Sequence, residues 1–128
     1  MTDNNNNNTN KMPIQPIVVC PLVYVLALEH GKWYVGITLN LNQRLAQHQV
    51  GIGARWTRLH RPLCVYKVIS PAAEETERQE TLRLMLSKGW QNVRGGPWCR
   101  IEMNAPPAPL LELQQQQQQQ QQPQGDAD

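Results

Sequence analysis

The stretch VYVLALEHGKWYVGIT, residues 23–38, decides the fold of this chain. Two runs of aliphatic and aromatic residues flank a His-Gly pair, a pattern that is typical of a β-hairpin. A three-residue loop at 29–31, with its glycine left-handed, would pair Tyr24 with Gly36 and place Tyr34 on the same face as Tyr24. A two-residue loop would separate the tyrosines, because neighbouring strand residues point to opposite faces. We expect the three-residue register.

That register gives a reason for a glycine inside the second strand. A missing side chain at Gly36, opposite Tyr24, would leave room for a ligand to approach the sheet closely. The alternative is that both tyrosines are ordinary strand aromatics. A binding site on this face is the more specific hypothesis.

The pattern further along the chain predicts two helices and a third strand. Residues 39–50 carry two leucines four positions apart within a helix-forming composition. Residues 63–70 alternate as a strand would, and residues 72–88 have a helical pattern that Gly89 would stop. This order of elements predicts an α+β domain.

Both ends of the chain are strongly biased in composition. Asn4–Asn8 form a run of asparagine, and Gln114–Gln122 form a run of glutamine. Polar tracts of this kind bury too little apolar surface to offset the entropy of ordering. We therefore expect disordered tails at 1–13 and 105–128, with one folded domain at 14–104.

The cysteines and the hydrophobic segments exclude several classes of protein. The three cysteines are widely spaced and include no CxxC pair, which argues against a zinc knuckle or a disulfide framework. The N-terminal residues do not show the basic region followed by an apolar run that is typical of a secretory signal. No apolar stretch is long enough to span a bilayer. We expect a soluble, intracellular protein without a membrane partner, in the cytoplasm or the nucleus.

Positive charge is concentrated in the middle of the chain, although the net charge is only +2. All 12 Lys and Arg residues, but only six of the ten acidic residues, lie within 11–104, and residues 30–73 contain no acid. Such a surface suits a polyanion such as a sugar-phosphate backbone, on which an aromatic side chain can also stack a base, and a solubilising face that happens to be positive is the alternative. The residues expected to contact DNA are Lys32, Arg55, Trp56, Arg58, Arg61 and Arg94. Trp56 could equally cover the core.

Four polar side chains have spacings that suit phosphate chemistry. Arg44 and His48 are four apart and share one stripe of their predicted helix. Arginine binds phosphate with a planar fork, and histidine can carry a proton near neutral pH. Glu77 and Glu80, three apart on the second helix, offer oxygen ligands for a hard divalent ion.

Together these residues resemble the GIY-YIG nuclease family, in which two short motifs form the first strands of a small three-stranded antiparallel sheet flanked by helices. VYVL and WYVG stand at those motifs, with different aliphatic neighbours beside the tyrosines and the glycine. Arg44, His48 and Asn92 follow in the order of the family, and NVRGG is similar to a segment of one stand-alone branch. For the glutamate, Glu77 matches that branch, whereas Glu80 matches the spacing in some other members. We favour Glu77.

The resemblance implies a metal-dependent DNA endonuclease that hydrolyses phosphodiester bonds with a single Mg²⁺ or Mn²⁺. The implied catalytic residues are Tyr24, Tyr34, Arg44, His48, Glu77 and Asn92. The glutamate would hold the ion, and the arginine would bind a phosphate oxygen. A phenol would help to activate water, which requires a nearby cation to lower its pKa.

A non-catalytic DNA-binding or protein-binding module on the same fold is the alternative, because a fold alone does not establish an activity. The presence of all six implied residues favours the enzyme. No second DNA-reading module is visible in the sequence, so long sequence specificity is not expected from this domain alone. Structured or repair-related DNA is the expected substrate, and a protein partner could supply specificity.

Overall fold

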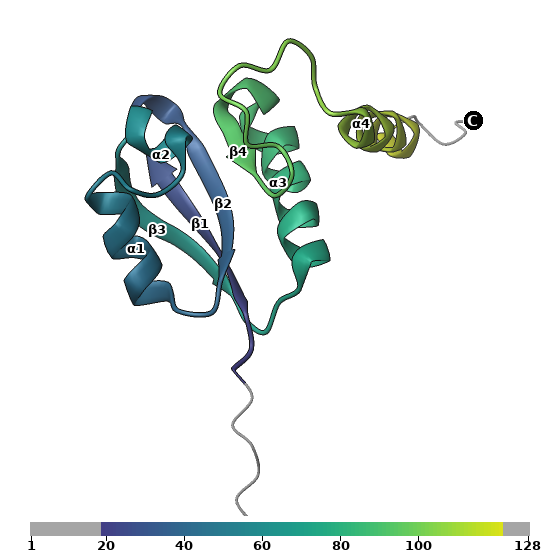
Figure 1. Ribbon diagram of the computed structural model, residues 1–128. Helices are drawn as coiled ribbons and strands as arrows, with labels where there is room; N and C mark the ends of the chain where they lie inside the picture. The colour runs from purple at the N-terminus through teal and green to yellow at the C-terminus, as the bar shows by residue number, and fades with distance from the viewer. Residues whose placement is uncertain (1–18, 122–128) are drawn as a thin grey trace, which may run out of the picture.

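The computed structural model describes residues 19–121, and Figure 1 shows its arrangement. The strands are β1 (Leu22–Leu28), β2 (Trp33–Thr38), β3 (Pro62–Ile69) and β4 (Val93–Gly95). The helices are α1 (Leu41–Gln49), α2 (Arg55–Leu59), α3 (Glu74–Lys88) and α4 (Ala108–Gln121), with short 3-10 turns η2 (Glu29–Gly31) and η3 (Trp90–Asn92). The α+β class predicted from the sequence is confirmed.

The β1–β2 hairpin has the predicted three-residue register. Tyr24 is paired with Gly36, and Tyr34 is paired with Leu26. The loop turns through two left-handed residues, His30 at φ 66° and Gly31 at φ 69°. Glycine adopts that conformation without strain, whereas a residue with a side chain adopts it less often. Both phenols therefore lie on the same face of the sheet.

The sheet has four strands rather than the three that the sequence predicted. Their order is β3-β1-β2-β4, and β4 runs parallel to β2 while the other pairs are antiparallel. The missed strand is only three residues long and includes a glycine, so it carries little strand signal. It joins the sheet through the α3 crossover, which no local pattern reveals.

Two helical layers cover the two faces of the sheet. One face packs against α3 through an apolar cluster in which Val23, Val25 and Val35 meet Leu82 and Met85. The other face carries Tyr24 and Tyr34 and lies beneath α1 and α2 (Figure 1). Alternation along the strands thus assigns the valines to one layer and the phenols to the other.

The C-terminal tract differs from the disordered tail predicted for 105–128. Residues 108–121 form α4, which packs against α3, and Leu110 is fully buried in the apolar cluster beside α3. Leucines at the start of this segment anchor it to the core, and glutamine is a good helix former that lets the helix continue. The predicted N-terminal tail at 1–13 and residues 122–128 lie outside the described part of the chain.

Within residues 19–121, no helix combines the length and the apolar character that crossing a membrane requires.

Candidate active site

The two hairpin tyrosines meet His48 at the centre of the candidate site. The Tyr24 hydroxyl lies 2.7 Å from His48 Nε2. The Tyr24 and Tyr34 ring centroids are 6.2 Å apart, and the Tyr34 ring lies edge-on to the His48 ring at 5.2 Å. Tyr24 and His48 are fully buried, so water does not compete for their hydrogen bond.

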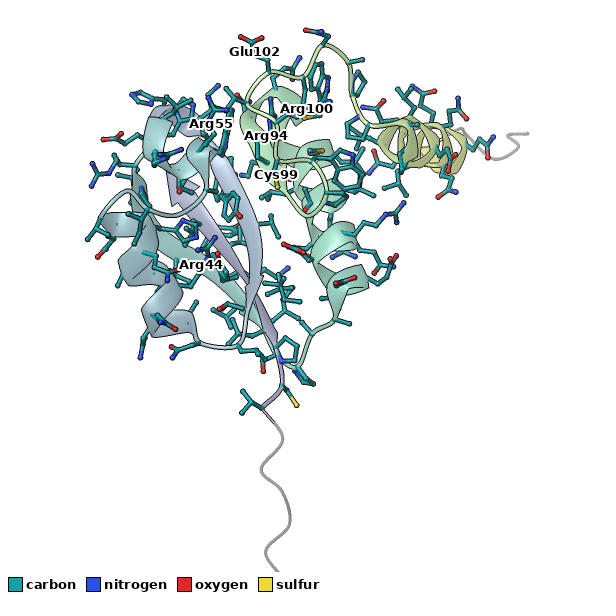
Figure 2. The ribbon with its side chains drawn as sticks, in the orientation of Figure 1. Arg44, Arg55, Arg94, Cys99, Arg100 and Glu102 are labelled. Carbon is teal, nitrogen blue, oxygen red and sulfur yellow. The ribbon has the colours of Figure 1, made fainter. Side chains whose placement is uncertain are left out.

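Helix α1 delivers both His48 and Arg44 to this face. The Asn40 side chain caps the helix by accepting a hydrogen bond from the Gln43 N–H at 3.1 Å. Arg44 and His48 are four positions apart and so lie on one side of α1, and Figure 2 shows Arg44 between α1 and the strands. Arg44 Nη1 donates to Gln47 Oε1 at 2.8 Å, and the charge of the guanidinium acts on the Tyr24 phenol.

Burial holds the central groups in their neutral forms. It raises the pKa of Tyr24, and the Arg44 guanidinium offsets only part of that rise. It also raises the pKa of Tyr34, with the neighbouring Tyr24 adding to the effect. Burial, assisted by Arg44, lowers the pKa of His48 to about 4. The charge of Arg44 acts to lower the pKa of both phenols, as expected from the sequence. The opposing effect of burial is larger, so neither phenol has a lowered pKa.

Gly36 has a different role from the one predicted. A Cβ atom built at this position would lie 2.4 Å from both Cζ and Oη of Tyr24. The space opposite Tyr24 is therefore filled by the tyrosine's own ring, and it is not left open for a ligand. Gly36 does allow a close approach, as predicted, but the group that lies against it is the Tyr24 side chain and not a ligand.

Glu77 approaches the site from α3. Burial raises the pKa of its carboxyl, the nearby Gly96 backbone opposes part of that rise, and Glu74 adds a smaller increase. It lines a surface pocket of about 540 Å³ together with Glu74 and Gly96. Its charge also acts on both Tyr24 and Tyr34. Glu77 thus lies at a surface pocket, and its charge reaches the tyrosines electrostatically.

The residues around Glu77 fit a single divalent ion. Among residues 19–121, no lysine or arginine forms an ion pair with this half-buried carboxylate, and Arg78, which lines the same pocket, pairs with Glu75 instead. No group of three His, Cys, Asp or Glu residues in the same range could hold a metal. Mg²⁺ is compatible with that arrangement, because it commonly uses one or two carboxylates and takes its other ligands from water and substrate phosphate.

Glu80, the competing candidate, faces another environment. Its carboxylate is almost fully buried and contacts Lys67 Nζ at 3.0 Å and Arg83 Nη1 at 2.7 Å. Two cations already neutralise it. Glu80 thus already has two countercharges, whereas none of the ion pairs within residues 19–121 involves Glu77.

Two residues expected at the DNA surface are buried instead. Trp56 packs among the core residues beneath α2 and donates from Nε1 to the Trp33 carbonyl at 2.9 Å. The Arg94 side chain is only 3% exposed and donates to four backbone carbonyls, including those of Arg100 and Ile101. Its guanidinium also stacks 4.4 Å from the Trp56 ring. The structure bears out the alternative given for Trp56, which covers the core, and the predicted DNA contact of Arg94 is wrong because its side chain does not reach solvent.

The other predicted cations remain accessible to different degrees. Arg55, Arg58 and Arg61 are exposed on or just after α2, on the tyrosine side of the sheet (Figure 2 labels Arg55). Lys32 is partly buried and donates to Asn92 Oδ1 at 2.9 Å. Asn92 also donates to the Lys88 carbonyl, and none of its hydrogen-bond partners is another predicted catalytic residue.

Three residues near the site were not predicted from the sequence. Thr57 lies 2.9 Å from His48 Nδ1, and Gly53 packs directly against the same imidazole. The Cys99 thiol donates to the Gly96 carbonyl and acts electrostatically on Tyr34 (Figure 2 labels Cys99). A single Thr, Gly or Cys has no periodic or motif signal, so only the tertiary structure brings these residues to the site.

Comparison with known proteins identifies the domain. The GIY-YIG catalytic domain matches residues 20–86, just over half of the chain. A UPF0213 protein of Halalkalibacterium halodurans is 32% identical over 81 residues, which cover 59% of this chain and 86% of that protein. A UPF0213 protein of Cupriavidus pinatubonensis is 41% identical over 59 residues, 45% of this chain and 66% of that protein. No solved structure matches the chain. The chain belongs to the GIY-YIG family of nuclease-type domains.

Proposed function

We propose that this protein is a metal-dependent endonuclease that hydrolyses phosphodiester bonds in DNA, with structured or repair-related DNA as its substrate. The observation that supports this most directly is the grouping of Arg44 with the Tyr24–His48 pair, with the Glu77 carboxylate close enough to act electrostatically on Tyr24. A phosphate-binding cation, a proton-carrying pair and an oxygen ligand are the groups that this hydrolysis needs.

Each of these residues has a role that follows from its chemistry. Arg44 would bind a non-bridging oxygen of the scissile phosphate through its donor fork. Glu77 would hold Mg²⁺ or Mn²⁺, which when bound supplies charge neutralisation at the phosphate and at the leaving 3′ oxygen. Tyr24 would help to activate the attacking water, and His48 would exchange a proton with Tyr24 across their 2.7 Å contact. Tyr34 would support Tyr24 by packing against it.

A cleavage assay with matched glutamate variants tests this proposal. The full chain is incubated with supercoiled plasmid and with a branched oligonucleotide, in Mg²⁺, Mn²⁺ or EDTA, beside Glu77→Gln and Glu80→Gln. We expect metal-dependent cutting by the wild type and Glu80→Gln, and a loss of at least about a hundredfold in Glu77→Gln. Cutting that survives in Glu77→Gln but is lost in Glu80→Gln would reassign the metal ligand.

The second candidate function is a binding module that does not cut DNA, and the exposed arginines of α2 favour DNA as its ligand. DNA affinity measured between about 50 and 200 mM salt separates the outcomes. Arg58→Ala should reduce the slope of log affinity against log salt by about one, whereas Arg83→Ala on α3 should leave it unchanged. Salt-sensitive binding without cutting by any form would favour the binding module, with a protein partner as the source of any activity.

A further inference from the structure

A chain of three buried polar side chains runs from the sheet into α2. Tyr24 on β1 contacts His48 on α1, and His48 contacts Thr57 on α2, with all three residues fully buried. The distances are 2.7 Å from Tyr24 Oη to His48 Nε2 and 2.9 Å from His48 Nδ1 to Thr57 Oγ1. The first two members belong to the proposed catalytic site, whereas Thr57 has no role assigned so far.

The hydroxyl proton of Thr57 fixes the direction of this chain. Thr57 donates its only hydroxyl hydrogen to the Ala54 carbonyl at 2.8 Å. Its oxygen can then only accept from the imidazole, so His48 carries a hydrogen on Nδ1. Because His48 is neutral well above its pKa of about 4, Nε2 has a free lone pair. That lone pair accepts the Tyr24 hydroxyl.

The surroundings of Tyr24 and His48 agree with this direction. The positive charge of Arg44 acts on the Tyr24 phenol, and a cation there favours a phenol oxygen whose hydrogen points away from it, toward His48. Behind the imidazole, a Cβ atom at Gly53 would lie 2.3 Å from Nδ1, so only glycine leaves room for the ring in this position. The ring is held from both sides.

We propose that Thr57 is a positioning residue that holds His48 in the Nδ1–H tautomer, so that Nε2 can receive the phenol proton of Tyr24. In this step the phenol proton moves from Tyr24 Oη to His48 Nε2 as Tyr24 Oη takes a proton from the attacking water, so the imidazolium forms without a separate phenolate. The Nδ1–H bond stays intact and continues to donate to Thr57 Oγ1. The relevance of this step to cleavage depends on the proposed nuclease function.

A threonine hydroxyl suits this role because it accepts and donates at the same time. Without that acceptor, the Nδ1–H group would be left unsatisfied in a buried site, which is unfavourable. The imidazole can avoid that cost by moving its hydrogen to Nε2 and donating to Tyr24. In that tautomer Nε2 cannot accept a proton, and the phenol loses its acceptor.

Nitrogen-15 NMR of the histidine rings tests the tautomer without DNA, metal or activity. Protonated and unprotonated ring nitrogens differ widely in chemical shift, and the spectrum of His48→Gln identifies the His48 signals among the three histidines. At neutral pH we expect Nδ1–H in the wild type and in Thr57→Ser, and Nε2–H in the near-isosteric Thr57→Val. An Nε2–H tautomer in the wild type would overturn the proposal, and this measurement does not depend on the folding of any Thr57 variant. An unchanged tautomer in a folded Thr57→Val protein would also overturn it.

Cleavage rates supply the second part of the test. We expect Thr57→Val to cut DNA about 10–100-fold more slowly with an unchanged KM, and Thr57→Ser to recover most of the rate. Equal rates in wild type and Thr57→Val, despite a changed tautomer, would overturn the role in positioning. A wild type that never cuts DNA would instead overturn the nuclease proposal, and the NMR result would still decide the tautomer.

Discussion

The two faces of the sheet are built from different kinds of side chain. Toward α3, the buried residues are aliphatic, with Val23, Val25 and Val35 packed on Leu82 and Met85. Toward α1 and α2, the buried residues include phenols, an imidazole, a hydroxyl and a guanidinium. Both faces are made by the same strands, so a one-residue step along β1 moves from apolar packing to hydrogen-bonded chemistry.

The difference shows how one small domain separates stability from reactivity. Aliphatic burial stabilises the α3 face without directional contacts, at roughly 25 cal/mol per Å² of apolar surface. The polar face must satisfy each buried donor and acceptor, as Arg94 does with four carbonyls and His48 does with Tyr24 and Thr57. We therefore expect substitutions on the α3 face to change stability mainly, and substitutions on the tyrosine face to change activity as well.

The largest stability effect is expected where α4 joins the apolar face. Leu110→Ala removes a fully buried side chain and should lower the free energy of unfolding by about 2–5 kcal/mol. Leu111→Ala, at a 45% exposed position on the same helix, should change it by about 0.5 kcal/mol or less. Urea unfolding of the full chain measures both. Equal, small effects would mean that α4 is not part of the apolar face.

The tyrosine face should respond to acid through His48. Its folded pKa of about 4 lies below the ordinary value of 6.5, so the unfolded chain binds a proton more readily. The resulting stability is fully present above pH 6.5 and is lost as pH falls toward 4, by about 3 kcal/mol in total. Unfolding free energies of wild type and His48→Gln across this range should differ by that pH-dependent amount. His60→Gln should keep most of the acid sensitivity, and parallel curves for wild type and His48→Gln would contradict the burial of a neutral imidazole.

The hairpin and the alternation of its faces were predictable because they depend on local rules. Turn length, strand periodicity and the left-handed glycine at residue 31 together fixed the register, and the structure confirms it. The helix spacing of Arg44 and His48 was equally local. Each of these inferences used neighbours in sequence, where the geometry of a helix or strand is known in advance.

The features that were missed depend on contacts between distant segments. Arg94 and Trp56 looked like DNA contacts until the fold placed one ring on the other and surrounded the guanidinium with carbonyls. The glutamine tract gave a low-complexity signal, yet Leu110 anchors its helix to α3. The composition of a segment can be read from the sequence, but whether its side chains are buried depends on contacts with distant segments.

The two hairpin glycines offer a sharper comparison of stability with activity. Gly36→Ala places a methyl group on the Tyr24 ring and should cost about 1–3 kcal/mol by overpacking. Gly31→Ala meets no atom within 4 Å but has a φ of +69°, so it should cost about 1–2 kcal/mol through backbone strain. Only Gly36→Ala should also slow DNA cleavage, since it moves Tyr24 away from His48. If both variants cut equally well, the position of Tyr24 does not control the reaction.

The smallest effect is expected for the ion pairs of Glu80, at the border of the apolar face. Glu80→Gln leaves Lys67 and Arg83 exposed enough for water to solvate them, so the loss should be only about 1 kcal/mol. Arg83→Ala removes a partner whose side chain is 66% exposed, and should cost about 0.5 kcal/mol or less. Urea midpoints of the two variants measure both losses, and their cleavage rates should match the wild type. A carboxylate that only neutralises two surface cations should not affect the cleavage rate. A large loss of cleavage in Glu80→Gln with little loss of stability would therefore mean that the α3 face also contributes a residue to catalysis.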